Sequence, residues 1–358
     1  SGRSALHRVF RGGSSRTQIR SAQTQNYPLN LAMAETAKPD LFVGVDLGGT
    51  KILAGVFNSQ LKLLQSAKLS TKSSRGFDAI VDRVARCVRD AVDEADMNLK
   101  QVRAIGIGAP GAVDPETGEV IFAPNLQWKE APLKKELEKQ LEIPVFVEND
   151  GNACALGVHE LELKGRSRSL LGIFLGTGVG GGIIIDGKVY RGFNGAAGEI
   201  GHMVLQVGGP KCGCGNNGCF EALASRTALF REIQQRVKGG EKTILTDMLG
   251  SELNDLKSGD LRKAVRKGDK LVEKVIESAA EYTGIAVANL LNILNPETVV
   301  LGGGVIDALQ DEMMSIIIET AMDYAMPGTV KGIEIVASKL GDNAGITGGA
   351  VLARQRFK

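Results

Sequence analysis

The stretch LFVGVDLGGTKILAGVF, residues 41–57, decides the fold class of this 358-residue chain. Its two apolar runs flank a turn with adjacent glycines, which is typical of a β-hairpin with buried strands. The next apolar run, LKLLQSAKL at 61–69, predicts a partner strand. A helical apolar pattern over 77–97 follows, and then two strand-like runs, VRAIGIG (102–108) and PVFVEN (144–149), with an amphipathic helix between them. Strands that alternate with helices predict an α/β domain.

A second series of the same kind begins near residue 170. LLGIFL (170–175) and GIIID (182–186) flank another glycine turn, and helical patterns fill much of 220–294. The last of these helices is expected to stop at Asn295-Pro296. A repeat of architecture without a repeat of sequence predicts two α/β domains around a central cleft. The expected boundaries are 39–149 plus 343–358 for the N-terminal domain, and 150–342 for the C-terminal domain.

Charge and hydropathy narrow the class of protein. The net charge is +2, and the part of the chain after residue 40 has slightly more acids than bases. Such a balance provides no excess of positive charge of the kind that binds the phosphates of nucleic acid. No run approaches 18 apolar residues, so no transmembrane helix is expected. The odd count of five cysteines, with three of them close together, indicates an intracellular, cytoplasmic protein with a metal site.

Residues 1–38 are expected to be a leader. Five Arg and five Ser precede the first acid, Glu35, and no apolar pattern is present. This composition suits a transit peptide for a plastid or mitochondrion. A segment ahead of a true start at Met33 fits equally well.

Three glycine clusters are candidates for binding a nucleotide. Backbone N–H groups in such turns bind phosphate oxygens, and Asp46 at the strand end is suited to a Mg²⁺ ion. The two hairpin turns are expected to face each other across the phosphates, and the third cluster to lie against the adenosine. The candidate residues are Asp46, Gly48, Gly49, Thr50 and Lys51, then Gly176, Thr177 and Gly178, then Gly302, Gly303 and Gly304. Plain glycine hairpins are the alternative.

Two familiar motifs are excluded at these turns. Residues 44–51 resemble a P-loop, but Thr50 precedes Lys51, where a P-loop has the opposite order. Residues 176–181 satisfy G-x-G-x-x-G, yet a strand pattern follows instead of the required helix. Dinucleotide binding is therefore disfavoured.

VENDGN, residues 147–152, joins a strand to an apolar helix. Asp at a helix start is often only a cap, but three polar residues exceed what a cap needs, and ligands bind at strand ends in α/β sheets. Phosphoryl transfer to an alcohol requires a carboxylate that accepts the hydroxyl proton. Asp150 is the candidate for this general base, and Asn149 for binding a neighbouring hydroxyl.

His202, Cys212, Cys214 and Cys219 form a Cys₃His set in glycine-rich sequence. Four such ligands predict a structural, tetrahedral zinc site. Glu199 and Glu221 flank the set, and carboxylates held there suit sugar hydroxyls; surface charge is the alternative. His159 and Trp128 are expected to be ordinary packing residues.

Taken together, four motifs resemble the ROK family of sugar kinases and repressors, in the actin-like ATPase (ribonuclease H-like) superfamily. They are DLGGTK (46–51), ENDGNA (148–153), LGTGVGGG (175–182), and AGEIGH with CGCGNNGCFE (197–221). The resemblance implies Asp150 as base, with Asn149, Glu199, His202 and Glu221 on the sugar. It also implies two less specific sugar-side positions, Gly111 and Asn125. Gly151 departs from the Ala that the family often has.

The activity that the resemblance implies is transfer of the γ-phosphoryl from Mg·ATP to a hexose 6-hydroxyl, in a homodimer or homotetramer. Glucose is the first choice of substrate, with N-acetylmannosamine, N-acetylglucosamine and fructose as alternatives. A repressor of this family would need a DNA-binding helix-turn-helix, for which residues 1–40 are too short and unpatterned. A non-catalytic sugar-binding protein would not need Asp150 or both glycine turns.

Overall fold

The computed structural model describes residues 40–357, in which two five-stranded sheets share one strand arrangement. In each, three strands pair antiparallel and two more continue the sheet in parallel. The first sheet has the order β3-β2-β1-β4-β8: β1 Leu41–Leu47, β2 Lys51–Phe57, β3 Leu63–Ser70, β4 Val102–Ala109 and β8 Val145–Asn149. The second has the order β11-β10-β9-β12-β13: β9 Ser169–Leu175, β10 Val179–Ile185, β11 Lys188–Val189, β12 Thr298–Gly302 and β13 Glu334–Ala337. The predicted repeat of architecture is thus present in the sheets.

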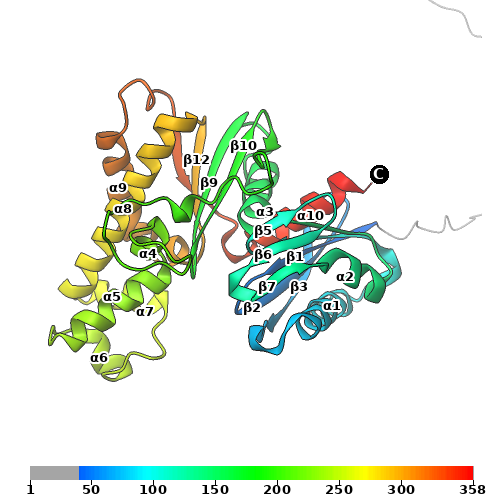
Figure 1. Cartoon of the computed structure of the whole chain (residues 1–358), viewed down its shortest axis with the longest axis horizontal. Helices are drawn as coiled ribbons and strands as arrows, with labels where there is room; N and C mark the ends of the chain where they lie inside the picture. The colour runs from blue at the N-terminus through cyan, green and yellow to red at the C-terminus, as the bar shows by residue number, and fades with distance from the viewer. Residues whose placement is uncertain (1–39, 358) are drawn as a thin grey trace, which may run out of the picture. The chain divides into compact units, whose positions relative to one another are not determined.

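Two helices lie between these sheets, other helices cover their outer faces, and α5, α6 and α7 pack on other helices beyond the second sheet (Figure 1). α10 packs on β1 and β4 of the first sheet, α3 packs on β9 and β10 of the second, and the two helices contact each other. On the outer faces, α1 covers β2 and β3, while α8 and α9 run side by side along the second sheet. The helices are α1 Phe77–Glu94, α2 Leu133–Leu141, α3 Asp150–Gly157, α4 Phe220–Ala224, α5 Arg226–Lys238, α6 Ile244–Leu249, α7 Ser258–Arg266, α8 Lys270–Leu294, α9 Gly304–Tyr324 and α10 Ala344–Arg356.

A third, smaller sheet was not predicted. It has the order β5-β6-β7, with β5 Ala112–Asp114, β6 Glu119–Ala123 and β7 Trp128–Ala131. The segment after Gly111 is strand over β5 and a turn afterwards. Gly111 directly precedes β5 and contacts Asn149 at the end of β8, while Asn125 lies in the turn between β6 and β7.

Separate apolar clusters lie under the two large sheets, which is what two domains require. The domain boundaries themselves stay a prediction, and the leader expected over 1–38 lies outside the described residues. Among the helices that the structure describes, none is long and apolar enough to cross a membrane.

Candidate functional site

The site is centred on the end of β8, where the chain turns into α3. Asn149 is the N-cap of α3, and its Oδ1 accepts the backbone N–H of Asn152 at 3.1 Å. Its Nδ2 donates to the carbonyl of Gly111 at 3.0 Å. The capping role considered for Asp150 therefore falls to Asn149. Asp150 is the first helical residue, and within residues 40–357 its carboxylate accepts one hydrogen bond, from the N–H of Gly151 at 2.8 Å.

The surroundings of Asp150 hold its proton unusually tightly. Loss of solvent raises the pKa of Asp150 to about 7, and the negative charges of Asp46 and Glu199 add to the shift, while the Gly151 N–H opposes it. Burial likewise raises the pKa of Asp46 to about 6, against the charge of Lys51. A carboxylate that titrates near neutral pH is suited to accept and release a proton.

The first glycine turn is held by a hydrogen bond of its own and by contacts with Thr71 and Asn125. Gly48 N–H donates to the carbonyl of Lys51 at 2.9 Å, and the hydroxyl of Thr71 donates to the carbonyl of Gly48 at 2.6 Å. A Cβ on Gly49 would lie 3.5 Å from the Cβ of Asn125, so this turn contacts the small sheet. The predicted positions Gly49 and Asn125 are therefore neighbours.

A cavity of about 430 Å³ lies between the glycine turns of the two large sheets. Seven of the eleven residues predicted for phosphate or nucleotide line it: Asp46, Thr50, Lys51, Gly176, Thr177, Gly303 and Gly304. The other four, Gly48, Gly49, Gly178 and Gly302, lie outside its lining. A Cβ on Gly178 would meet the Glu221 carboxylate, and one on Gly302 would meet the Phe174 ring. Packing explains these last two glycines.

Three charged residues that line the cavity were missed by sequence reasoning: Lys68, Arg226 and Asp342. Asp342 pairs with Lys51 at 2.9 Å. Burial alone would raise the pKa of Asp342, but the hydrogen bond and charge of Lys51 outweigh it, so this pKa lies below its ordinary value. Arg226 donates through its side chain to the Thr177 hydroxyl and through its backbone to the Gly176 carbonyl. No spacing signal links these residues, because each comes from a different segment.

The predicted Cys₃His set is brought together. One ligand atom from each of His202, Cys212, Cys214 and Cys219 lies within 4.8 Å of the others. The Sγ atoms of Cys214 and Cys219 are 3.7 Å apart, and Cys212 Sγ is 3.6 Å from His202 Nδ1. Sulfur ligands at tetrahedral positions about 2.3 Å from zinc would be about 3.8 Å apart. The four side chains therefore fit a zinc ion.

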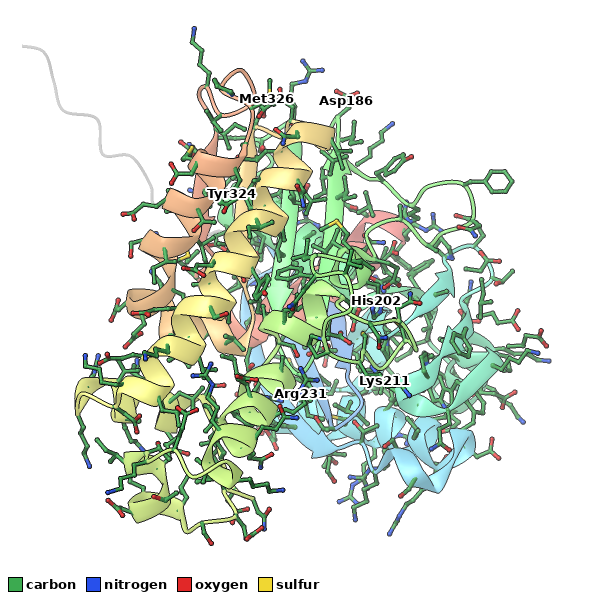
Figure 2. All side chains as sticks on the ribbon, turned by 60° about the vertical axis from the view of Figure 1, so that its left-hand side comes forward. Asp186, His202, Lys211, Arg231, Tyr324 and Met326 are labelled. Carbon is green, nitrogen blue, oxygen red and sulfur yellow. The ribbon has the colours of Figure 1, made fainter. Side chains whose placement is uncertain are left out.

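Two acids predicted for the sugar lie next to this cluster. Glu221 has Oε1 3.6 Å from Cys212 Sγ, and its Oε2 accepts the N–H of Val179 at 3.0 Å, so it joins the cluster to the second glycine turn. Glu199 Oε2 is 3.9 Å from His202 Nε2, the ring nitrogen that faces away from Cys212. Figure 2 shows His202 on the loop beside α4. Glu199 remains half-exposed, which leaves it accessible to a ligand.

The two residues expected only to pack are both buried. The ring of His159 bonds the carbonyl of Ser167 at 2.8 Å and the carboxylate of Glu160. Trp128 packs edge-on against Phe77, with ring centroids 5.0 Å apart.

Comparisons with known proteins agree with this arrangement. Residues 42–356 match the ROK family. The glucokinase of Halalkalibacterium halodurans is 35% identical over 316 residues, which are 88% of this chain and 95% of that protein. The xylose repressor of Caldicellulosiruptor bescii is 33% identical over 260 residues, which are 73% of this chain and 65% of the repressor.

A solved structure extends the likeness to three dimensions. The ROK family glucokinase from Streptomyces griseus, in complex with glucose and AMPPNP, is 34% identical. It superposes with a TM-score of 0.79 over 88% of this chain and 99% of its own. The predicted actin-like ATPase fold is thereby confirmed, as is the resemblance that the four motifs carried. The chain belongs to the ROK family.

Proposed function

We propose that this chain is an ATP-dependent hexose kinase that transfers the γ-phosphoryl group of ATP to the 6-hydroxyl of glucose. The observation that carries the proposal is the carboxylate of Asp150, which has a pKa of about 7 and lies at the end of β8 between two groups of site residues. The charges of Asp46, which lines the nucleotide-sized cavity, and of Glu199, beside the Cys₃His cluster, both raise its pKa. The glucokinase relatives, similar over most of the chain, support glucose as the sugar.

ATP is proposed to occupy the cavity between the glycine turns. Its phosphates would lie against the backbone of the two glycine turns, at Thr50 and Gly176, and against the cationic side chains of Lys51, Lys68 and Arg226. Gly303 and Gly304, at the start of α9, would adjoin the adenosine. Asp46 is the residue best suited to hold Mg²⁺, which neutralises charge on the phosphates when it is bound.

The sugar is proposed to bind beside Asp150, with its 6-hydroxyl at the free carboxylate oxygen. Asp150 would accept the hydroxyl proton as the oxygen attacks the γ-phosphorus in line with the departing ADP. The other sugar-side residues are Asn149, Glu199, His202, Glu221, Gly111 and Asn125. Since Asn149 also caps α3, and Glu221 also bonds the second turn, their sugar contacts would be shared with structural ones.

A zinc ion is proposed for the Cys₃His cluster. Four protein ligands leave no open position, so the ion would be structural. It would fix the loop that carries His202, and His202 bound through Nδ1 would keep Nε2 for the sugar or Glu199. A cytoplasmic location and a homodimer or homotetramer complete the proposal. Light scattering on the purified chain would test the assembly.

A coupled assay of ADP release tests the activity. Glucose, mannose, fructose, N-acetylglucosamine and N-acetylmannosamine are compared, and ³¹P NMR identifies the phosphorylated oxygen. Glucose is expected to give the highest kcat/KM, with glucose 6-phosphate as product. A higher kcat/KM for an N-acetyl sugar or for fructose would instead identify the chain as the corresponding alternative kinase.

The general base is tested by Asp150→Asn, which keeps the side-chain volume and loses the proton acceptor. We expect kcat to fall by about 10³-fold or more, since a positioned base contributes 10²–10⁴-fold. Glucose binding, measured by calorimetry, should survive. Turnover close to the wild-type rate would exclude Asp150 as base.

The second candidate is a sugar-responsive protein without catalysis, and the repressor relative is its support. Such a protein would bind glucose in the same calorimetric experiment but release no ADP with any of the five sugars. The assay therefore separates the two functions.

A further inference from the structure

Glu148, two residues before Asp150, forms an ion pair with Arg191. Arg191 donates to Glu148 Oε2 through Nη2 at 2.6 Å and through Nε at 2.8 Å. The Glu148 side chain is 3% exposed, and its Oε1 accepts the N–H of Asn149 and the Nδ2 of Asn152. A buried carboxylate with all its hydrogen bonds made is held rigidly, and it strongly disfavours the loss of its counter-ion.

The two partners come from opposite sides of the candidate site. Glu148 lies in β8 of the first sheet, whereas Arg191 is the second residue of the loop 190–199, which follows β11 of the second sheet and ends at Glu199. This loop closes on itself, since the N–H of Ala197 donates to the Arg191 carbonyl at 3.1 Å. Arg191 therefore links the N-terminal end of the loop to Glu148 of β8.

Both ends of the loop are also held by β10 of the second sheet: the N–H of Tyr190 donates to the carbonyl of Ile183 at 2.7 Å, and a Cβ on Gly198 would lie 3.1 Å from the carbonyl oxygen of Gly181. Phe193, near its tip, is fully exposed, so apolar packing does not fix the tip. Gly195 approaches β5, where a Cβ would lie 2.9 Å from the carbonyl of Val113. The charge of Glu199 reaches Asp150, whose pKa it raises. The buried ion pair thus ties the loop that ends at Glu199 to β8, the strand that leads directly into Asp150.

We propose that Arg191 is a positioning residue: through Glu148 it sets the place of Glu199, and of the loop 190–199, relative to Asp150. The inference rests on the proposed function, in which both acids contact the sugar. It adds a determinant of sugar affinity that lies outside the candidate site residues. Because neither partner of the pair lines the nucleotide cavity, its loss should act on the sugar and not on ATP.

The test compares Arg191→Met, Arg191→Lys and the double variant Glu148→Gln/Arg191→Met with the wild type. The double variant removes the buried Glu148 charge together with its partner Arg191. It therefore still tests the proposal if Arg191→Met does not fold. The matched control is Arg168→Met, which breaks the Arg168–Asp186 pair at 2.7 Å. That pair is exposed and joins the ends of β9 and β10 far from the glycine turn, and Figure 2 shows Asp186 well away from His202.

The measurements are KM for glucose and for ATP, kcat, the glucose Kd by calorimetry, and the melting temperature. Arg191→Met is expected to raise the glucose KM and Kd about tenfold and to lower kcat by up to about 100-fold, as a small misplacement of reacting groups does. The ATP KM should stay within about twofold of the wild type. Arg191→Lys should recover part of the loss, because it keeps the charge but not the planar fork.

A purely structural role would lower the melting temperature and the yield of active protein without changing either KM. The inference is overturned if the folded Arg191 or double variant keeps its glucose KM, if the ATP KM rises in parallel, or if Arg168→Met shows the same loss. A wild-type chain that neither binds nor phosphorylates any of the five hexoses would instead overturn the proposed function, and this inference with it.

Discussion

Asp150 shows how neighbouring residues tune a single side chain. Burial and the charge of Asp46 bring its pKa to about 7, and a base works only when it is deprotonated. Below pH 7 most Asp150 would carry a proton, so kcat/KM for glucose should rise with pH and level off above about 7. The profile is measured under subsaturating glucose. A midpoint near about 4, the ordinary Asp value, would show that the carboxylate is better solvated than the structure indicates.

Candidate residues with strong chemical signatures could be identified from the sequence, and residues whose role depends on tertiary contacts could not. The acid after β8 and the Cys₃His set each lie within one short segment, so sequence spacing alone makes them visible. Lys68, Arg226 and Asp342 meet in one cavity from three distant segments. The same holds for the pairing of Glu148 with Arg191, which lie 43 residues apart in the chain.

Among the elements, the loop from His202 to Glu221 is the one that the proposed zinc ion would hold. It contains little regular structure. Its segments pair only at isolated β-bridges, such as that between Val204 and Cys219. Cys214→Ala is expected to lower the zinc content from about one ion per chain to none. Without this ligand the loop loses its fixed shape, and glucose affinity should fall about tenfold or more.

Zinc is measured by mass spectrometry of the metal and glucose binding by calorimetry. Cys87→Ala is the control, because Cys87 is buried in α1, apart from the cluster. That variant should keep both zinc and glucose affinity. Full glucose affinity in a zinc-free Cys214→Ala protein would separate the metal from the sugar site.

The long helices and most strands of the two large sheets were predicted with bounds close to those observed, and the shortest strands were not. Apolar periodicity is clear over α1 or α8, which have 18 and 25 residues. β5 has only three residues, too few for an alternating pattern to be detected. The π-helical turn Val158–Glu162 that continues α3 has no sequence signal of its own, since it differs from a helix only in how its hydrogen bonds are paired.

At the scale of the whole molecule, the repeated hairpin-and-parallel arrangement of the two sheets followed from the order of strand and helix patterns. The close crossing of α3 with α10 between those sheets did not, although it decides how the two halves meet. The crossing depends on small residues at one point. A Cβ added to Gly348 would lie 1.7 Å from the carbonyl oxygen of Ala153, and one added to Gly157 would lie 2.7 Å from the N–H nitrogen of Gly348.

Gly348→Ala should therefore force α10 away from α3 and destabilise the protein by about 3 kcal/mol, the upper range for overpacking a core. The same substitution at Gly259, in the first turn of α7, meets no atom within 4 Å. There the gain in helix propensity should stabilise the fold by about 0.5–1 kcal/mol. Urea unfolding of both variants gives the two free energies. Because α3 begins at Asp150 and α10 adjoins Asp46 through Gly345, a displaced crossing should also lower kcat in Gly348→Ala protein that remains folded. Equal stability of the two variants would show that the halves meet with more room than the close approach of these backbones allows.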